Sequence, residues 1–271
     1  MKTVIESIKY NDGKFPRKQL EQIIERKEEA IPELLFIVRE VKENPDVFLE
    51  DHESRMDFHY AIHLLSQFRV KEFFPLWIDI LSLPEQLSDA VLGDIITEAG
   101  GRMIASVFKG DLGSIQTLIE NTQLSEFVRG QGLHALVILA LHGLLERKFV
   151  INYFKTLLTE KLSEEHDGFN AHLVNSCVDL YPQETYEFIE AAIEKEMVDF
   201  MMISMEDVDQ TLAMPKETIF EENLTDIHYQ LINDTITEMQ WWTCFEEGKK
   251  EEEISPFAFD SKFSNSEPNL K

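Results

Sequence analysis

Cysteine, glycine and proline are all scarce in this sequence. Cysteine occurs only as Cys177 and Cys244 in a chain of 271 residues. Two thiols so far apart in sequence form neither a zinc-binding motif nor a disulfide framework, so we expect a reduced cytoplasmic protein without a cofactor. The 11 glycines and 9 prolines are too few for an all-β fold with many tight turns. Their scarcity favours long helices.

Long hydrophobic runs are also missing. The longest unbroken apolar run in the middle of the chain covers 135–141, which is far too short to cross a bilayer. The N-terminus reaches Glu6 before an apolar stretch can form, so no signal peptide is predicted. We therefore expect a cytoplasmic protein with no membrane partner.

Positive charge is sparse and unevenly distributed. The formal net charge is −26, and no arginine follows Arg147. Residues 1–150 hold 24 acidic and 17 basic side chains, whereas residues 151–271 hold 27 acidic and 8 basic side chains. Nucleic-acid binding requires the opposite field, so direct nucleic-acid contact is not expected. An acidic binding surface, if the protein has one, is expected toward the second half.

Helical periodicity recurs along most of the chain, and no stretch alternates as a strand would. One stripe, for example, contains Ile31, Leu34, Leu35, Val38 and Val41. The pattern predicts an all-α fold, an α-α superhelix of the HEAT or armadillo type with about five helix pairs and a C-terminal helix. The predicted pairs are 16–29 with 31–43, 55–68 with 71–82, 88–98 with 102–120 (the latter broken near Gly110), 125–142 with 146–159, and 169–180 with 183–197.

Punctuation and composition predict how the chain is divided. Prolines that stand where helices should begin are Pro16, Pro32, Pro75, Pro84 and Pro182. The segment 133–145 is apolar on every side, so we expect it in the middle of the stack. Residues 1–200 are predicted to form the helical-repeat solenoid, and 201–245 an irregular segment with a terminal capping helix near 219–240. Residues 246–271 are predicted to form an acidic, mobile tail.

Several runs of residues resemble an uncharacterised bacterial family. They are the run 58–65 (FHYAIHLL), the run 93–98 (GDIITE), the run 179–182 (DLYP) and the run 241–245 (WWTCF). The chain resembles the family of domain of unknown function eleven-eighty-six over roughly residues 15–245. The resemblance implies a HEAT-like fold and no catalytic residues. Some members append a cysteine-rich zinc motif like the tail of the SecA translocation ATPase, but this sequence has no cysteine after Cys244.

Two pairs of histidines have helical spacing. His59 and His63 are four residues apart, which would present both imidazoles on one helical face to a metal. The residues between them lack the Glu that acts as base in helical zinc hydrolases, so we favour structural, hydrogen-bonded histidines and no metal site. His134 and His142 are eight residues apart on the apolar helix, where we expect hydrogen bonds between helices.

The best candidate for an interaction patch lies around Asp94, Glu98 and Arg102. Asp94 and Glu98 are a like-charged pair four residues apart, which Arg102 one turn later could neutralise. The adjacent glycines at 100–101 predict a helix break or a close backbone approach. This stretch is either an ordinary corner between repeats or part of an acidic groove.

Trp241 and Trp242 are the other candidates for the interaction patch. With Phe245 they either cap the core of the last repeat or form an exposed aromatic anchor for a partner.

These features favour a non-enzymatic scaffold or adaptor that binds a protein partner, one with a basic segment, through an acidic surface. Two alternatives remain open. The first is a mimic of nucleic acid that inhibits a DNA- or RNA-binding protein, and the second is a metal-dependent hydrolase that uses His59 and His63. The sequence does not determine the oligomeric state.

Overall fold

The computed structural model describes residues 1–50, 55–163 and 166–245, and these ranges are all-α, as the sequence predicts. No named strand occurs in them, and one isolated bridge pairs Tyr10 with Arg55. The predicted tail at 246–271 lies outside the described residues. The helices are α1 (Lys2–Glu6), α2 (Arg17–Glu25), α3 (Lys27–Glu43), α4 (Pro45–Glu50), α5 (Asp57–Gln67), α6 (Phe73–Leu81), α7 (Glu85–Leu92), α8 (Ile95–Val107), α9 (Leu112–Glu120), α10 (Glu126–Leu141), α11 (Arg147–Glu160), α12 (Asp167–Asp179), α13 (Tyr186–Glu194), α14 (Met205–Ala213), α15 (Lys216–Thr225) and α16 (Thr235–Met239). Short 3₁₀ turns are η3 (Pro182–Glu184), η4 (Ile227–Tyr229) and η5 (Thr243–Phe245).

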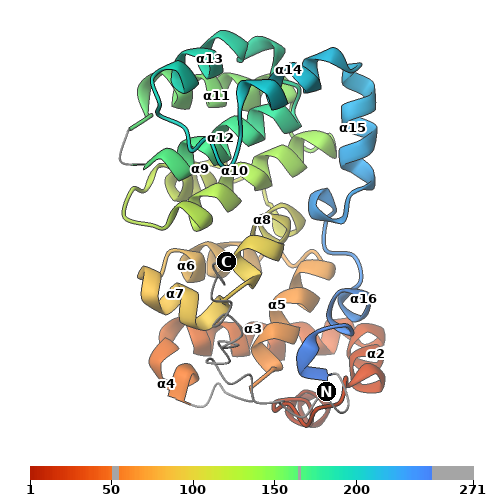
Figure 1. Cartoon of the computed structure of the whole chain (residues 1–271). Coiled ribbons are helices and arrows are strands. Elements are labelled where there is room, and N and C mark those ends of the chain that lie inside the picture. The colour runs from red at the N-terminus through yellow and green to blue at the C-terminus, as the bar shows by residue number, and fades with distance from the viewer. Residues whose placement is uncertain (51–54, 164–165, 246–271) are drawn as a thin grey trace, which may run out of the picture.

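The helices stack along one direction (Figure 1). One row contains α3, α5, α8, α10 and α12, and each of these helices contacts the next. In a second layer α6 packs against α3 and α8, α9 against α10, and α11 against α10 and α12. Each helix in the row therefore buries apolar residues toward neighbours on more than one side.

The centre of the stack is α10. It contacts α8, α9, α11 and α12, and its residues from Val128 to Leu139 are buried except for the half-buried His134. This confirms the central position that the apolar segment 133–145 predicts. The buried part of that segment ends with the helix, because Leu144 lies beyond Leu141 and is exposed.

The predicted third helix pair is wrong in its boundaries. The sequence predicts a helix boundary between residues 98 and 102, but α8 continues through the glycine pair. The break predicted near Gly110 is present, and the φ of Gly110 is +96°. The glycines mark a close approach of α8 to α10. A Cβ atom on Gly101 would lie 2.9 Å from the backbone oxygen of Gln131 and 3.2 Å from the nitrogen of Ala135.

Two further predictions differ from the structure. Pro16 and Pro84 directly precede α2 and α7, but Pro32 lies inside α3, because α3 already begins at Lys27. The single helix predicted at 219–240 is replaced by α15, the turn η4 and the short helix α16. Asp234 ends the irregular stretch by accepting hydrogen bonds from the backbone nitrogens of Ile236 and Thr237.

No helix in the described part of the chain is both long and apolar enough to span a membrane.

The contact between α8 and α10 generates the first prediction. Gly101→Ala should lower the free energy of unfolding by about 1–3 kcal/mol, because the added methyl group meets backbone atoms of α10 that cannot rotate away. Gly113→Ala is the matched control, since Gly113 is exposed in α9 and its Cβ would meet no atom closer than 3.6 Å. Urea unfolding should show the control to be neutral or stabilising by up to about 1 kcal/mol. Equal effects of the two substitutions would contradict the close approach.

Candidate functional site

Residues 226–245, which we call the return segment, run back along the stack after α15. In Figure 1 the blue ribbon descends from α15 past η4 to α16, which lies near α2. At the end of the segment the Phe245 ring packs edge-on against Phe15, with 5.2 Å between the ring centroids. The end of the return segment therefore contacts the N-terminal part of the chain, just before α2.

Side chains of α5 and α8, with Arg69 just after α5, satisfy the backbone of the return segment. Because the stretch between η4 and α16 is not helical, its buried amide and carbonyl groups need other partners. Arg69 Nη1 donates to the carbonyl of Ile232 at 2.6 Å, and the Ile232 amide donates to Ser106 Oγ at 2.9 Å. The Thr235 amide donates to Gln67 Oε1 at 2.9 Å. The segment is thus fixed by specific contacts as well as by the burial of Ile232.

Arg102 makes a largely buried charged contact with the return segment. Its Nη1 and Nη2 donate to the two carboxylate oxygens of Glu238 at 2.9 and 2.8 Å, and its Nε donates to the carbonyl of Gln230 at 2.8 Å. The side chains of Arg102 and Glu238 are 6% and 14% exposed. The expectation that Arg102 neutralises Asp94 and Glu98 is therefore wrong, because its guanidinium is committed to the return segment.

Between α8 and the return segment lie two adjoining cavities of about 270 and 370 Å³, which we call the tryptophan groove. Both cavities are lined by Ile95, Glu98, Trp241 and Trp242, so these residues form the wall between them. The smaller cavity continues along α8 and η4, with the further lining residues His63, Ala99, Arg102, Ile227, His228, Thr237 and Glu238. The larger one lies toward the start of α8, with His59, Leu92, Asp94, Thr243 and Cys244.

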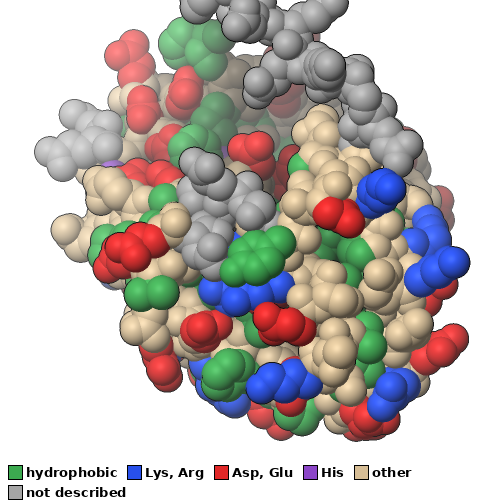
Figure 2. Space-filling model, turned by 90° about the horizontal axis from the view of Figure 1, so that it is seen from below, with side chains coloured by type: hydrophobic (Ala, Val, Ile, Leu, Met, Phe, Trp, Pro, Cys, Tyr) green, Lys and Arg blue, Asp and Glu red, His purple; other side chains and the backbone are tan. Residues whose placement is uncertain are grey.

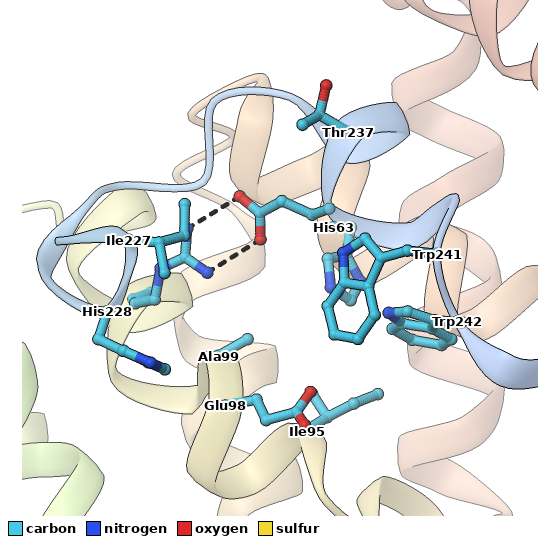
Figure 3. Close-up of a pocket in the computed structure, with 11 residues that line it drawn as sticks. His63, Ile95, Glu98, Ala99, Ile227, His228, Thr237, Trp241 and Trp242 are labelled. Atoms are coloured by element: carbon cyan, nitrogen blue, oxygen red, sulfur yellow. Dashed lines mark hydrogen bonds and ion pairs between the residues drawn. The ribbon is translucent and has the colours of Figure 1, made fainter.

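The two tryptophans have different surroundings. Figure 3 shows Trp241 and Trp242 projecting from the return segment, with Ile95, Glu98 and Ala99 on α8 across the opening. The Trp241 side chain is left 64% exposed. Trp242 packs edge-on against the rings of His59 and His63 at centroid distances of 6.0 and 5.7 Å. The predicted packing on the last repeat is therefore wrong for Trp242, which lies on α5 in the first half.

The two histidines of α5 are part of this packing. His63 Nδ1 donates to the carbonyl of His59 at 2.8 Å, and burial lowers the pKa of His63 to about 4, so its imidazole is neutral near pH 7. Among the residues that the structure describes, no group of three or more His, Cys, Asp or Glu side chains is arranged to hold a metal ion. These contacts favour the structural interpretation of His59 and His63.

His134 and His142 also meet the return segment, at Tyr229. His142 Nε2 lies 2.9 Å from the Tyr229 carbonyl oxygen, and the His134 ring packs edge-on against the Tyr229 ring. The Tyr229 hydroxyl donates to Asp179 Oδ1 at 2.8 Å. Burial raises the pKa of Asp179 to about 7, although this hydrogen bond acts in the opposite direction.

Two of the carboxylates that line the groove, those of Asp94 and Glu98, have no ion pair among the described residues. Asp94 and Glu98 are both exposed, and within the described ranges no ion pair joins either of them to a lysine, arginine or histidine. Arg102, which also lines the groove, is neutralised by Glu238. The groove therefore combines an apolar aromatic wall with uncompensated negative charge, an arrangement that can bind a positively charged group.

All five residues predicted as an interaction patch line this groove, namely Asp94, Glu98, Arg102, Trp241 and Trp242. Sequence reasoning missed Ile227 and Glu238, which lie more than a hundred residues from α8 along the chain. Nothing in the local periodicity pairs Glu238 with Arg102. Only the unusual Arg within the buried, glycine-containing part of α8 was a signal that a distant acidic partner was needed.

Comparison with known proteins confirms the family resemblance. The model of a family described as "Protein of unknown function (DUF1186)" matches residues 1–246. A relative named "Uncharacterized protein" from Chlamydia trachomatis serovar D (strain ATCC VR-885 / DSM 19411 / UW-3/Cx) is 32% identical over 240 residues, which cover 88% of this chain and 94% of the relative. One of the same name from Chlamydia muridarum (strain MoPn / Nigg) is 32% identical over 246 residues, covering 88% and 95%. No solved structure matches the chain.

The Arg102–Glu238 pair generates the second prediction. Glu238→Ala should destabilise the protein by about 3–5 kcal/mol, because it leaves the buried Arg102 guanidinium without its anion. The double variant Arg102→Met with Glu238→Leu should recover a large part of this loss, since no uncompensated charge is then buried. Chemical denaturation of the two variants beside the original chain gives the three free energies. A double variant less stable than Glu238→Ala would contradict this explanation.

The third prediction concerns pH and Asp179. The unfolded chain releases this proton near pH 3.9 and the folded chain only near pH 7, so through this group the free energy of unfolding falls as pH rises from about 4 to about 7. Asp179→Asn keeps an acceptor for Tyr229 and should remove this slope, so its stability relative to the original chain should increase across that range. Asp209→Asn, which alters the exposed Tyr186–Asp209 hydrogen bond, is the matched control. The assignment fails if both substitutions change the pH dependence of denaturation equally.

Proposed function

We propose that this chain, which belongs to the DUF1186 family of proteins of unknown function, is a non-enzymatic HEAT-like scaffold of the cytoplasm that binds a basic segment of a protein partner in the tryptophan groove. The observation that carries the proposal is the exposed Trp241 beside Asp94 and Glu98, neither of which forms an ion pair with a described residue. Tryptophan is enriched among the residues that dominate binding energy at protein interfaces, and its indole ring also attracts cations.

The size of the groove supports a polypeptide ligand. The cavity of about 270 Å³ is below the range of ~300–1,000 Å³ that is usual for sites of small molecules and cofactors, and the cavity of about 370 Å³ is near the lower end of that range. Each cavity can take a side chain, and the rest of a partner segment would remain on the surface. This arrangement is typical of peptide recognition, in which pockets for individual side chains provide specificity.

The net charge favours a basic partner. A charge of −26 steers positively charged molecules toward the protein and repels acidic ones. The charge inside the groove is also negative. Glu238 neutralises Arg102, whereas Asp94 and Glu98 form no ion pair with a described residue. Long-range attraction and local contact therefore select the same class of partner.

The two alternative functions have less support. Mimicry of nucleic acid requires a continuous acidic surface, but Figure 2 shows Lys and Arg side chains interspersed with Asp and Glu on the end of the molecule seen from below. A hydrolase that uses His59 and His63 would need their imidazoles free for a metal, whereas Trp242 packs against both rings. We therefore put forward one function.

The fourth prediction tests the proposal by capture of the partner. The immobilised full chain should retain a basic protein from a lysate of the source organism at low salt and release it at high salt. Trp241→Ala should weaken the interaction with that partner, once purified, by at least about tenfold. Phe200→Ala is the matched control, because Phe200 is an exposed aromatic residue (80%) outside the groove.

Thermal unfolding should show that Trp241→Ala is folded, as expected for a side chain with 64% exposure. A partner that both variants bind equally well, or an acidic partner, would contradict the proposal.

A further inference from the structure

We infer that the tryptophan groove recognises two neighbouring side chains of one segment, an apolar one in the smaller cavity and a positively charged one in the larger cavity. This inference rests on the proposed function and specifies its ligand. It follows from the different chemistry of the two cavities on either side of the wall formed by Ile95, Glu98, Trp241 and Trp242.

Among the described residues that line the smaller cavity, the one carboxylate without an ion pair is that of Glu98, and the larger cavity shares it. The carbon surface of the smaller cavity comes from Ala99, Ile227 and the residues of the shared wall. The charges of Arg102 and Glu238 cancel each other in their bidentate ion pair, and His63 is neutral near pH 7 because burial lowers its pKa to about 4. A cation in the larger cavity already uses the Glu98 carboxylate, so a second charged side chain placed in the smaller cavity would lose hydration without gaining a counter-ion of its own. An apolar side chain would instead cover the exposed faces of Ile227 and Trp241.

The larger cavity has the opposite character. Asp94 lies at the N-terminus of α8 and Glu98 follows one turn later, and both carboxylates remain exposed beside Trp241. Its other lining residues outside the shared wall, His59, Leu92, Thr243 and Cys244, include no lysine or arginine. An ammonium or guanidinium group there can lie against the indole ring and near two carboxylates, which combines a cation–π contact with charge-assisted hydrogen bonds.

The shared wall sets the spacing of the two ligand groups. Because both cavities touch Trp241, Trp242, Ile95 and Glu98, side chains that fill them are neighbours on either side of these four residues. Two such side chains come from residues close together in one segment, as in an extended peptide, where residues i and i+2 point to the same side. The groove should therefore distinguish a paired motif from either residue alone.

The probes for this inference are blocked hexapeptides with one Leu and one Lys, placed one, two or three residues apart in a glycine background. The reporters are the indole N–H signals of the three tryptophans in the full-length ¹⁵N-labelled chain. Trp77 is buried and donates to the carbonyl of Gly100, so its signal is an internal control. With millimolar peptide we expect the signals of Trp241 and Trp242 to shift while that of Trp77 stays in place.

Replacing Lys by norleucine, or Leu by glycine, should weaken binding by about tenfold. Glu98→Gln in the protein should abolish the preference for Lys over norleucine. Glu217→Gln, which changes an exposed carboxylate of α15 outside the groove, should preserve it.

Several results would overturn the inference, namely no shift with any peptide, equal binding of the Lys and norleucine peptides, or a Lys preference that survives Glu98→Gln. The proposed function and the two-residue motif are tested by different results. If the captured partner depends on Trp241 but the peptides are not distinguished by charge, the scaffold proposal remains and the two-residue motif is wrong. If the peptides are distinguished but the partner is indifferent to Trp241, the motif remains and the scaffold proposal is wrong.

Discussion

The guanidinium of Arg102 is the contact on which the groove depends. It is almost completely buried in α8 and makes all three of its described hydrogen bonds to the return segment, two to Glu238 and one to the carbonyl of Gln230. A buried cation must be paired, so once α8 has folded around Arg102 the acidic return segment is strongly favoured at this position. Its docking brings Trp241 and Trp242 opposite Ile95 and Glu98 and thereby creates both cavities.

The return segment also changes how the helix stack is held together. In an ordinary helical repeat each unit contacts only its neighbours, so stability is close to a sum of local terms. Here one segment contacts Gln67 of α5, Ser106 of α8 and His142 beside α10, which belong to three different pairs. Its end at Phe245 also reaches Phe15. A binding site formed by this segment is therefore coupled to the stability of several repeats at once.

Sequence reasoning correctly predicted what depends on local periodicity and failed where distant residues meet. The all-α class, most helix pairs and the central α10 follow from apolar spacing, and Gly101 signalled a close approach. The partner of Arg102, the packing of Trp242 and the broken helix at 219–240 did not follow, because each is set by contacts across more than a hundred residues. The sequence predicts a binding face toward the second half, whereas the groove that we propose for binding is lined by Glu98 from the first half and Trp241 from the second.

The central claim is that side chains of the helix stack hold the return segment in place and so create the groove. Amide hydrogen exchange at Ile232 and Thr235 tests it most directly, because these N–H groups donate to Ser106 Oγ and Gln67 Oε1 and not to a helix of their own. The account predicts that both amides exchange far more slowly than in an unstructured peptide, and that Ser106→Ala accelerates exchange at Ile232. Exchange of both amides at the rate of an unstructured peptide in the intact protein would contradict it.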